Sequence, residues 1–212
     1  MGKLVLKQVV ATVISNRRLL RAFERGGWAS GRPEGRDTLG SWIIWLDCSE
    51  IAEKAKPGQF VMVRCGEGTL PRPFSIHKKN KDRIALFYTA WVGGKGTQWL
   101  SQCKASDKID LFGPLGNGFV VYPTSKNLLL VAGGIGIAPL CFLAQKALRQ
   151  GYSVTLLRGA SGEPKPSGKE NPSQQYPERL LPHRINVHTV TTSYDYAERV
   201  VTGVVRELIP KY

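Results

Sequence analysis

The chain has 212 residues, which is enough for one large domain or two compact ones, each with its own hydrophobic core. Apolar residues make up 42% and charged residues 22%, a balance that is ordinary for a folded protein and excludes a disordered one. The formal net charge of +14 suits nucleic acid, an anionic cofactor or an acidic partner. No helix-turn-helix, zinc-finger or RNA-binding signature accompanies this charge, so no motif supports the nucleic-acid alternative.

A membrane span and a metal site are also disfavoured. The longest uncharged apolar run, Leu128 to Ala144, approaches the length of a membrane span, but its glycines and proline favour a turn between a strand and a helix. No signal peptide is visible, so we expect a cytoplasmic protein that is not bound to a membrane. The four cysteines are too far apart for the short loops that hold zinc or iron–sulfur clusters, so we expect free thiols and no metal. They are Cys48, Cys65, Cys103 and Cys141.

The first part of the chain predicts a small antiparallel barrel. Runs of β-branched and aromatic residues, separated by turn residues, indicate strands over 3–14, 41–48, 59–64, 83–91 and 108–112, with one short helix near 97–103. Residues 17–40 are rich in arginine and glycine, and we expect them to form a long basic loop or insertion.

The pattern changes after a polar, proline-bearing link over 122–127. A continuous apolar run, a helix stopped by a glycine and two further strands are typical of a nucleotide-binding α/β unit. These elements are expected over 128–132, 137–150, 153–157 and 185–190, with a proline-rich loop over 162–182 and a possible helix over 202–209. The predicted fold class is therefore an antiparallel β-barrel domain over 1–122, followed over 123–212 by a Rossmann-like α/β domain that lacks its last strands.

The strongest local motif is LLLVAGGIGIAPL at 128–140. A buried strand leads into Gly133, Gly134 and Gly136, and a helix with Pro139 in its first turn follows. Glycines let an anion approach the backbone closely, and a helix start presents unpaired N–H groups to it. The spacing G-x-G-x-x-P differs from the usual dinucleotide fingerprint. The motif predicts phosphate or pyrophosphate binding, and the alternative is a tight packing bend.

Three further segments can bind an anion or serve as plain turns or surface positions. Arg72-Pro73-Phe74-Ser75-Ile76-His77 offers a planar guanidinium three residues before a hydroxyl. The segment 93–97 (GGKGT) precedes the short helix and forms a potential anion cradle. The segment 113–119 (GPLGNGF) is a rigid loop between the two halves of the chain.

The order RPFS, GKGT, GPLGNGF and GGIGIAPL resembles the ferredoxin-reductase superfamily, and most of all the electron-transfer subunits of NAD-dependent dihydroorotate dehydrogenase. The resemblance covers about residues 41–160. It implies a flavin-dependent oxidoreductase of pyrimidine biosynthesis that binds FAD and, with less support, NAD. It also implies a catalytic dihydroorotate dehydrogenase subunit as the partner that exchanges electrons with this chain.

The resemblance also assigns cofactor-binding residues. Arg72 would hold the FAD pyrophosphate, Ser75 would reach the isoalloxazine ring, and the helix start at 96–97 would bind the diphosphate. The whole set is Arg72, Pro73, Phe74, Ser75, Phe87, Tyr88, Thr89, Gly96 and Thr97 for FAD, and Gly133, Gly134, Gly136 and Pro139 for the pyridine nucleotide. No acid–base residue is assigned, because the redox chemistry belongs to the flavin.

The chain departs from the family pattern at several places. The family's four-cysteine [2Fe–2S] loop has no counterpart before Tyr212, and Thr191–Asp195 stands where an Asp-Gly-Ser motif is usual. The basic segment 17–40 is also atypical. FAD binding survives these departures best, whereas electron transfer through a cluster has no ligands within this chain. Two alternatives remain open, namely a stand-alone NAD(P)H-dependent flavin oxidoreductase and a basic binding protein that has lost its cofactor.

Overall fold

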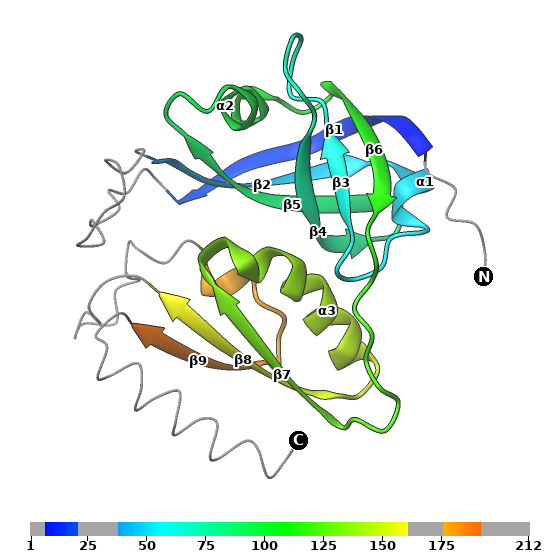
Figure 1. Cartoon of the computed structure of the whole chain (residues 1–212), viewed down its shortest axis with the longest axis vertical. Coiled ribbons are helices and arrows are strands. Elements are labelled where there is room, and N and C mark those ends of the chain that lie inside the picture. Colours follow the sequence, from blue (N-terminus) through cyan, green and yellow to red (C-terminus); the bar gives the residue numbers. More distant parts are fainter. Residues whose placement is uncertain (1–6, 21–37, 161–175, 192–212) are drawn as a thin grey trace.

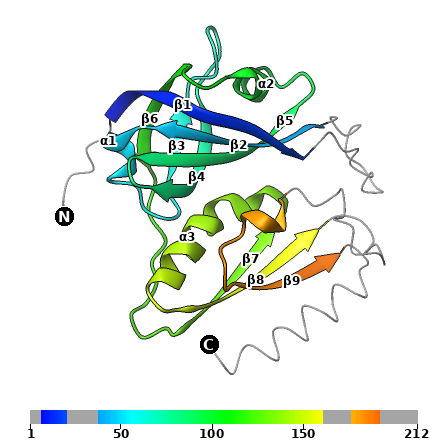
Figure 2. The same ribbon diagram turned by 180° about the vertical axis from the view of Figure 1, so that it is seen from behind.

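The computed structural model describes residues 7–20, 38–160 and 176–191. These residues form a closed six-stranded antiparallel barrel and a separate three-stranded parallel sheet (Figure 1). One long helix lies between the barrel and the parallel sheet, and the view from behind in Figure 2 shows the same order of layers. The predicted fold class, a barrel followed by an α/β unit, is confirmed.

The barrel strands neighbour one another in the order β1-β2-β5-β4-β3-β6. They are β1 (Lys7–Leu20), β2 (Thr38–Asp47), β3 (Phe60–Val63), β4 (Arg72–Asn80), β5 (Arg83–Trp91) and β6 (Lys108–Leu115), accompanied by the helices α1 (Ser49–Ala52) and α2 (Lys95–Gln102). Closure of the ring leaves no unpaired strand edge. Alternate side chains such as Ile44, Leu86 and Ile109 point inward and form the barrel core.

The barrel differs from the sequence prediction in two ways. The strand β4 was not predicted, because its outward positions are polar and hide the alternation. The basic loop expected over 17–40 is wrong at both ends, since Arg17 and Arg18 belong to β1 and β2 already begins at Thr38. Pairing with β2 extends β1, and the Arg18 guanidinium lies 5.3 Å above the centre of the Trp42 ring. The middle of that segment, 21–37, lies outside the described residues.

The parallel sheet has the strand order β7-β8-β9. Its elements are β7 (Asn127–Gly133), the 3-10 turn η1 (Gly134–Gly136), α3 (Ile137–Arg149), β8 (Ser153–Ala160), the 3-10 turn η2 (Glu178–Leu180) and β9 (Asn186–Thr191). Within the described part of the chain, no helix is long and apolar enough to cross a membrane. The helix expected over 202–209 lies outside the described residues.

The helix α3 joins the two layers. Its buried residues on the sheet side include Ala144 and Ala147, which pack with Leu130 and Leu156 of the parallel strands. The same cluster contains Phe87, which comes from the barrel. The helix therefore covers the parallel sheet with one side and the outer face of the barrel with another.

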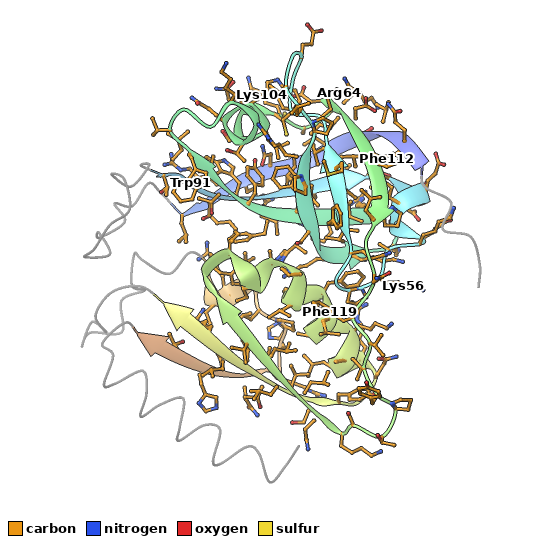
Figure 3. All side chains as sticks on the ribbon, in the orientation of Figure 1. Lys56, Arg64, Trp91, Lys104, Phe112 and Phe119 are labelled. Carbon is orange, nitrogen blue, oxygen red and sulfur yellow. The ribbon has the colours of Figure 1, made fainter. Side chains whose placement is uncertain are left out.

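The glycine-rich segment 113–119 leads the chain out of the barrel and is hydrogen-bonded to it. The Phe119 N–H donates to the Pro57 carbonyl at 2.8 Å, and the Gln59 side-chain amide donates to the Gly116 carbonyl at 2.9 Å. Figure 3 shows Phe119 at this exit from the barrel, on the side where Lys56 also lies. These bonds give the segment a structural role as the connection that leaves the barrel.

We expect Gly58→Ala to destabilise the protein more than Gly68→Ala. Both glycines have a positive φ, +92° and +67°, so alanine at either position costs about 1 kcal/mol of backbone strain. At Gly58 a Cβ would also lie 2.9 Å from the Phe119 backbone nitrogen, whereas at Gly68 nothing lies within 4 Å. The loss in unfolding free energy, measured in urea, should be about 2 to 4 kcal/mol for Gly58→Ala. Equal losses in the two variants would contradict this packing.

Candidate functional site

Arg72, the first residue of β4, meets the start of α2. A Cβ built on Gly96, in the first turn of α2, would lie 3.4 Å from Cγ and 3.6 Å from Nε of Arg72. The Arg72 side chain is exposed to solvent, while Gly96 is buried beneath it. A guanidinium and the N–H groups of a helix start therefore face the same place. This pairing suits a diphosphate, which each of the two features can bind by itself.

The other end of α2 is anchored to the barrel. Asn16 on β1 donates its side-chain N–H groups to the carbonyls of Leu100 at 2.8 Å and Cys103 at 3.0 Å. The Asn16 side-chain oxygen accepts a hydrogen bond from the Tyr88 hydroxyl at 3.1 Å. Leu100 is fully buried in the barrel core. These contacts fix the direction of the helix and hence the place of its amino-terminal end beside Arg72.

The amino-terminal end of α2 has no side-chain cap of its own. Its N-cap residue is Gly94, which makes no side-chain cap hydrogen bond, and the Thr97 hydroxyl donates back to the Gly94 carbonyl at 3.4 Å. A Cβ on Gly93 would have nothing within 4 Å, so the approach to the helix start is open. A bound anion can therefore take the place of the missing cap.

The thiol nearest to this place is not a nucleophile. Burial first, and then the interaction with Cys103, raise the pKa of Cys65 to about 11, although the positive charge of Arg72 acts in the opposite direction. The thiol therefore stays protonated at neutral pH. All four cysteines are buried and free, and no group of three or more potential metal ligands gathers among the described residues.

The barrel strands separate the predicted flavin contacts into two faces. The side chains of Phe74 and Tyr88 point into the barrel, where their rings meet edge to face with centroids 5.8 Å apart. Tyr88 also stacks on Trp42 at 6.1 Å. Both side chains therefore belong to the barrel core in this structure. The cofactor-binding roles expected for Phe74 and Tyr88 stay predictions.

The outward positions of β4 and β5 are covered to different degrees. Phe87 is 2% exposed and packs against the rings of His77 and Tyr176, with centroids 5.7 and 4.9 Å apart. The Thr89 hydroxyl lies buried 3.4 Å from that of Ser41. Only Ser75 is half-buried, as a residue at the rim of a ligand site would be. The roles expected for Ser75, Phe87 and Thr89 stay predictions.

The glycine turn of the parallel sheet is open to solvent. Gly133 ends β7, the turn η1 follows, and α3 begins at once with Pro139 in its first turn. A Cβ on Gly133 or Gly136 would have nothing within 4 Å, and Gly134 has a φ of +52°. A packing bend would place neighbouring atoms against these glycines. The open space instead fits the close approach of a phosphate to the start of a 13-residue helix.

Two residues at the contact between the barrel and α3 were not predicted from the sequence to have this role. They are His77 and Tyr176. His77 lies two positions after Ser75 on β4 and is 0% exposed. Its Nδ1 lies 2.8 Å from the Ala138 carbonyl on α3, and its Nε2 lies 3.1 Å from the Tyr176 hydroxyl. Both partners of the ring are distant in sequence, so no local signal could have indicated this role.

No protein-family model matches the chain. It is 44% identical over 123 residues to the dihydroorotate dehydrogenase B (NAD(+)) electron transfer subunit of Desulforamulus reducens. The aligned region covers 57% of this chain and 47% of that protein. It is 30% identical over 175 residues to the same subunit of Shouchella clausii, which covers 79% of this chain and 63% of that protein. The chain thus spans about half the length of the curated relatives it matches.

Solved structures show the same fold at lower identity. The ferredoxin reductase of carbazole 1,9a-dioxygenase aligns with a TM-score of 0.71 at 17% identity, over 100% of this chain and 61% of that one. A second match is an NADH-dependent reduced ferredoxin-NADP oxidoreductase, described for flavin-based electron bifurcation. It aligns with a TM-score of 0.69 at 21% identity, over 96% of this chain and 64% of that one. The chain therefore has the ferredoxin reductase-like fold, and its sequence relatives are electron transfer subunits of dihydroorotate dehydrogenase B.

Proposed function

We propose that the chain binds FAD against the barrel and a pyridine nucleotide at the glycine turn. It would pass electrons between NAD and a catalytic dihydroorotate dehydrogenase subunit, as a step in pyrimidine biosynthesis. The observation that carries this proposal is the meeting of Arg72 with Gly96 at the start of α2, because it joins two anion-binding features from separate segments of the chain.

FAD fits the residues on the barrel. Arg72 and the first turn of α2, with Gly96 and Thr97, would hold the diphosphate, and Pro73 fixes the backbone between Arg72 and the rest of β4. Ser75 would turn its hydroxyl toward the ring system. When bound, FAD accepts two electrons as a hydride and can release them singly. The chain's part is to bind, orient and shield the cofactor.

The pyridine nucleotide fits the start of α3. Gly133, Gly134 and Gly136 leave room for its diphosphate at the backbone, and the missing N–H of Pro139 costs nothing in the first turn of a helix. The domain boundary near residues 122 and 123 stays part of the proposal. It agrees with the end of β6 at Leu115 and the start of β7 at Asn127.

The names of the sequence relatives support a catalytic dihydroorotate dehydrogenase subunit as the partner. A [2Fe–2S] cluster, which the family resemblance implies, does not fit the described residues. Their cysteines are buried, and they form no group of metal ligands. We derive no electron-transfer step through such a cluster.

Arg72→Ala should weaken FAD retention about 10- to 100-fold, because a charge-assisted hydrogen bond to a phosphate contributes about 1.5 to 3 kcal/mol. The measurement is a fluorescence titration of the FAD-free full chain with FAD. The matched control is Arg64→Ala, which removes a 59% exposed arginine that pairs with Asp110 at 3.3 Å and is labelled in Figure 3. Equal FAD affinity in the Arg72→Ala and Arg64→Ala variants would show that Arg72 does not bind the cofactor.

Gly136→Ala should weaken binding of NADH about tenfold or more while FAD stays bound, because a methyl group would fill the space that the phosphate needs. The backbone at Gly136 is right-handed helical and nothing lies within 4 Å of the new methyl group, so stability should not fall. The measurement is the NADH concentration at half-maximal flavin reduction, with Lys146→Ala on the same helix as control. An unchanged value would remove the glycine turn from the nucleotide site.

A further inference from the structure

We propose that His77 is a positioning residue that fixes the nucleotide turn relative to the flavin site. It would hold the first turn of α3 against β4, the strand that carries Arg72 and Ser75. This inference rests on the proposed function wherever its consequence for electron transfer is concerned. The hydrogen bond between His77 and Ala138 is a property of the chain itself, and its effect on α3 can be measured without either ligand.

The position of His77 connects the two candidate sites. On the barrel side it follows Ser75 by two residues and shares its outward face. On the other side its Nδ1 reaches the carbonyl of Ala138, which lies in the first turn of α3, two residues after Gly136. One fully buried side chain therefore links the strand of the proposed flavin site to the helix start of the proposed nucleotide site.

The hydrogen bonds define the protonation of the imidazole. A carbonyl oxygen can only accept, so Nδ1 carries the proton that binds Ala138 at 2.8 Å. The unprotonated Nε2 then accepts from the Tyr176 hydroxyl at 3.1 Å. The Tyr176 hydroxyl has one proton and two acceptors at 3.1 Å, this Nε2 and the Leu180 carbonyl, which also accepts a hydrogen bond from the Lys78 ammonium. Both ring nitrogens of the neutral His77 are satisfied when the hydroxyl donates to Nε2.

The groups that face His77 keep it neutral. Burial and, to a smaller degree, the charge of Lys78 lower its pKa from 6.5 to about 3, although the hydrogen bond to the Ala138 carbonyl acts in the opposite direction. From the other elements, Cys141 of α3 contacts the Tyr176 hydroxyl at 3.4 Å, and Arg158 of β8 lies 3.5 Å from the Tyr176 carbonyl. Neither is a carboxylate that could stabilise an imidazolium. His77 therefore acts by its geometry and does not transfer protons.

Such a link matters because hydride transfer depends strongly on distance. Reacting atoms must come within about 3 to 3.5 Å, and a displacement of about 1 Å can cost about 100-fold in rate. The bond from His77 to Ala138 restrains the helix that carries one reactant against the strand that carries the other. Loss of this bond should slow the transfer without removing either binding site.

Two substitutions separate the two bonds of the ring. In His77→Asn the amide nitrogen lies near the place of Nδ1 and can still donate to Ala138. In His77→Gln the amide oxygen lies near the place of Nε2, which keeps the acceptor for Tyr176 and gives up the bond to α3. Both variants replace the ring with a neutral amide, and Asn removes more volume than Gln, so a packing defect alone would give the opposite order of effects.

We expect His77→Gln to slow flavin reduction at saturating NADH about tenfold or more, with FAD retention unchanged. It should also speed amide exchange in the first two turns of α3, measured on the full chain without nucleotide. His77→Asn should stay within about threefold of the wild type in both measurements. Equal behaviour of the two variants, or unchanged exchange and rate in His77→Gln, would overturn the inference.

The wild-type chain provides a test that does not depend on the folding of a variant. With ¹⁵N-labelled histidine, His77 should show an Nδ1–H tautomer that does not titrate between pH 7 and 5. An Nε2–H tautomer, or titration near 6.5, would overturn the inference.

A stability measurement follows from the same bonds. The unfolded imidazole takes up a proton below about pH 6.5 that the buried one refuses down to about pH 3, so the native state loses stability as the pH falls through this window. His77→Asn should lose less stability than the wild type across this window. A difference between the two proteins that does not change with pH would contradict the buried neutral state.

These outcomes separate the inference from the proposed function. A wild-type chain that binds FAD and is not reduced by NADH would refute the proposed electron transfer, while amide exchange and the histidine tautomer would still decide whether His77 holds α3. A wild-type chain that is reduced normally, beside a His77→Gln variant that is equally fast and equally protected, would refute the positioning role alone.

Discussion

The structure depends on one packing contact, that of α3 with the outer face of the barrel at β4. A three-stranded parallel sheet has two apolar faces, and α3 covers one of them while its opposite side lies on the barrel. This contact buries Phe87 and His77, which would otherwise be outward residues of an antiparallel strand pair. Because the glycine turn leads directly into α3, the same contact determines where the turn lies relative to Arg72 and Ser75.

The two candidate anion sites share the same local structure. Each consists of glycines at the start of a helix that has no side-chain cap hydrogen bond, which leaves backbone N–H groups of the first turn for an anion. At α2 the guanidinium of Arg72 adds a fixed positive charge, and the buried side of the helix is held by Asn16 and Leu100. At α3 the open surroundings of Gly133 and Gly136 leave room for a diphosphate. FAD would thus bind on the barrel side, and the pyridine nucleotide on the sheet side, of the contact between α3 and β4.

The sequence predicted the local elements better than their contacts. The strand at 83–91 and the helix at 137–150 were anticipated almost to the residue, because β-branched periodicity, a glycine stop and a proline in the first turn are local signals. The strand β4 was missed, because its outward residues are polar or buried only by another layer. The inward orientation of Phe74 and Tyr88 could not be predicted for the same reason, since the face that a strand residue occupies depends on pairing. The role of His77 depends wholly on Ala138 and Tyr176, which are distant in sequence, so no local pattern could have indicated it.

We propose above all that this chain binds FAD. The most direct measurement is the visible absorption spectrum of the purified full chain, followed by acid release and mass identification of any pigment. We expect a flavin spectrum, a released compound with the mass of FAD, and bleaching of the colour by NADH. A colourless protein that also fails to take up added FAD would contradict the account, and the charge of +14 would then direct attention to a binding function without a cofactor.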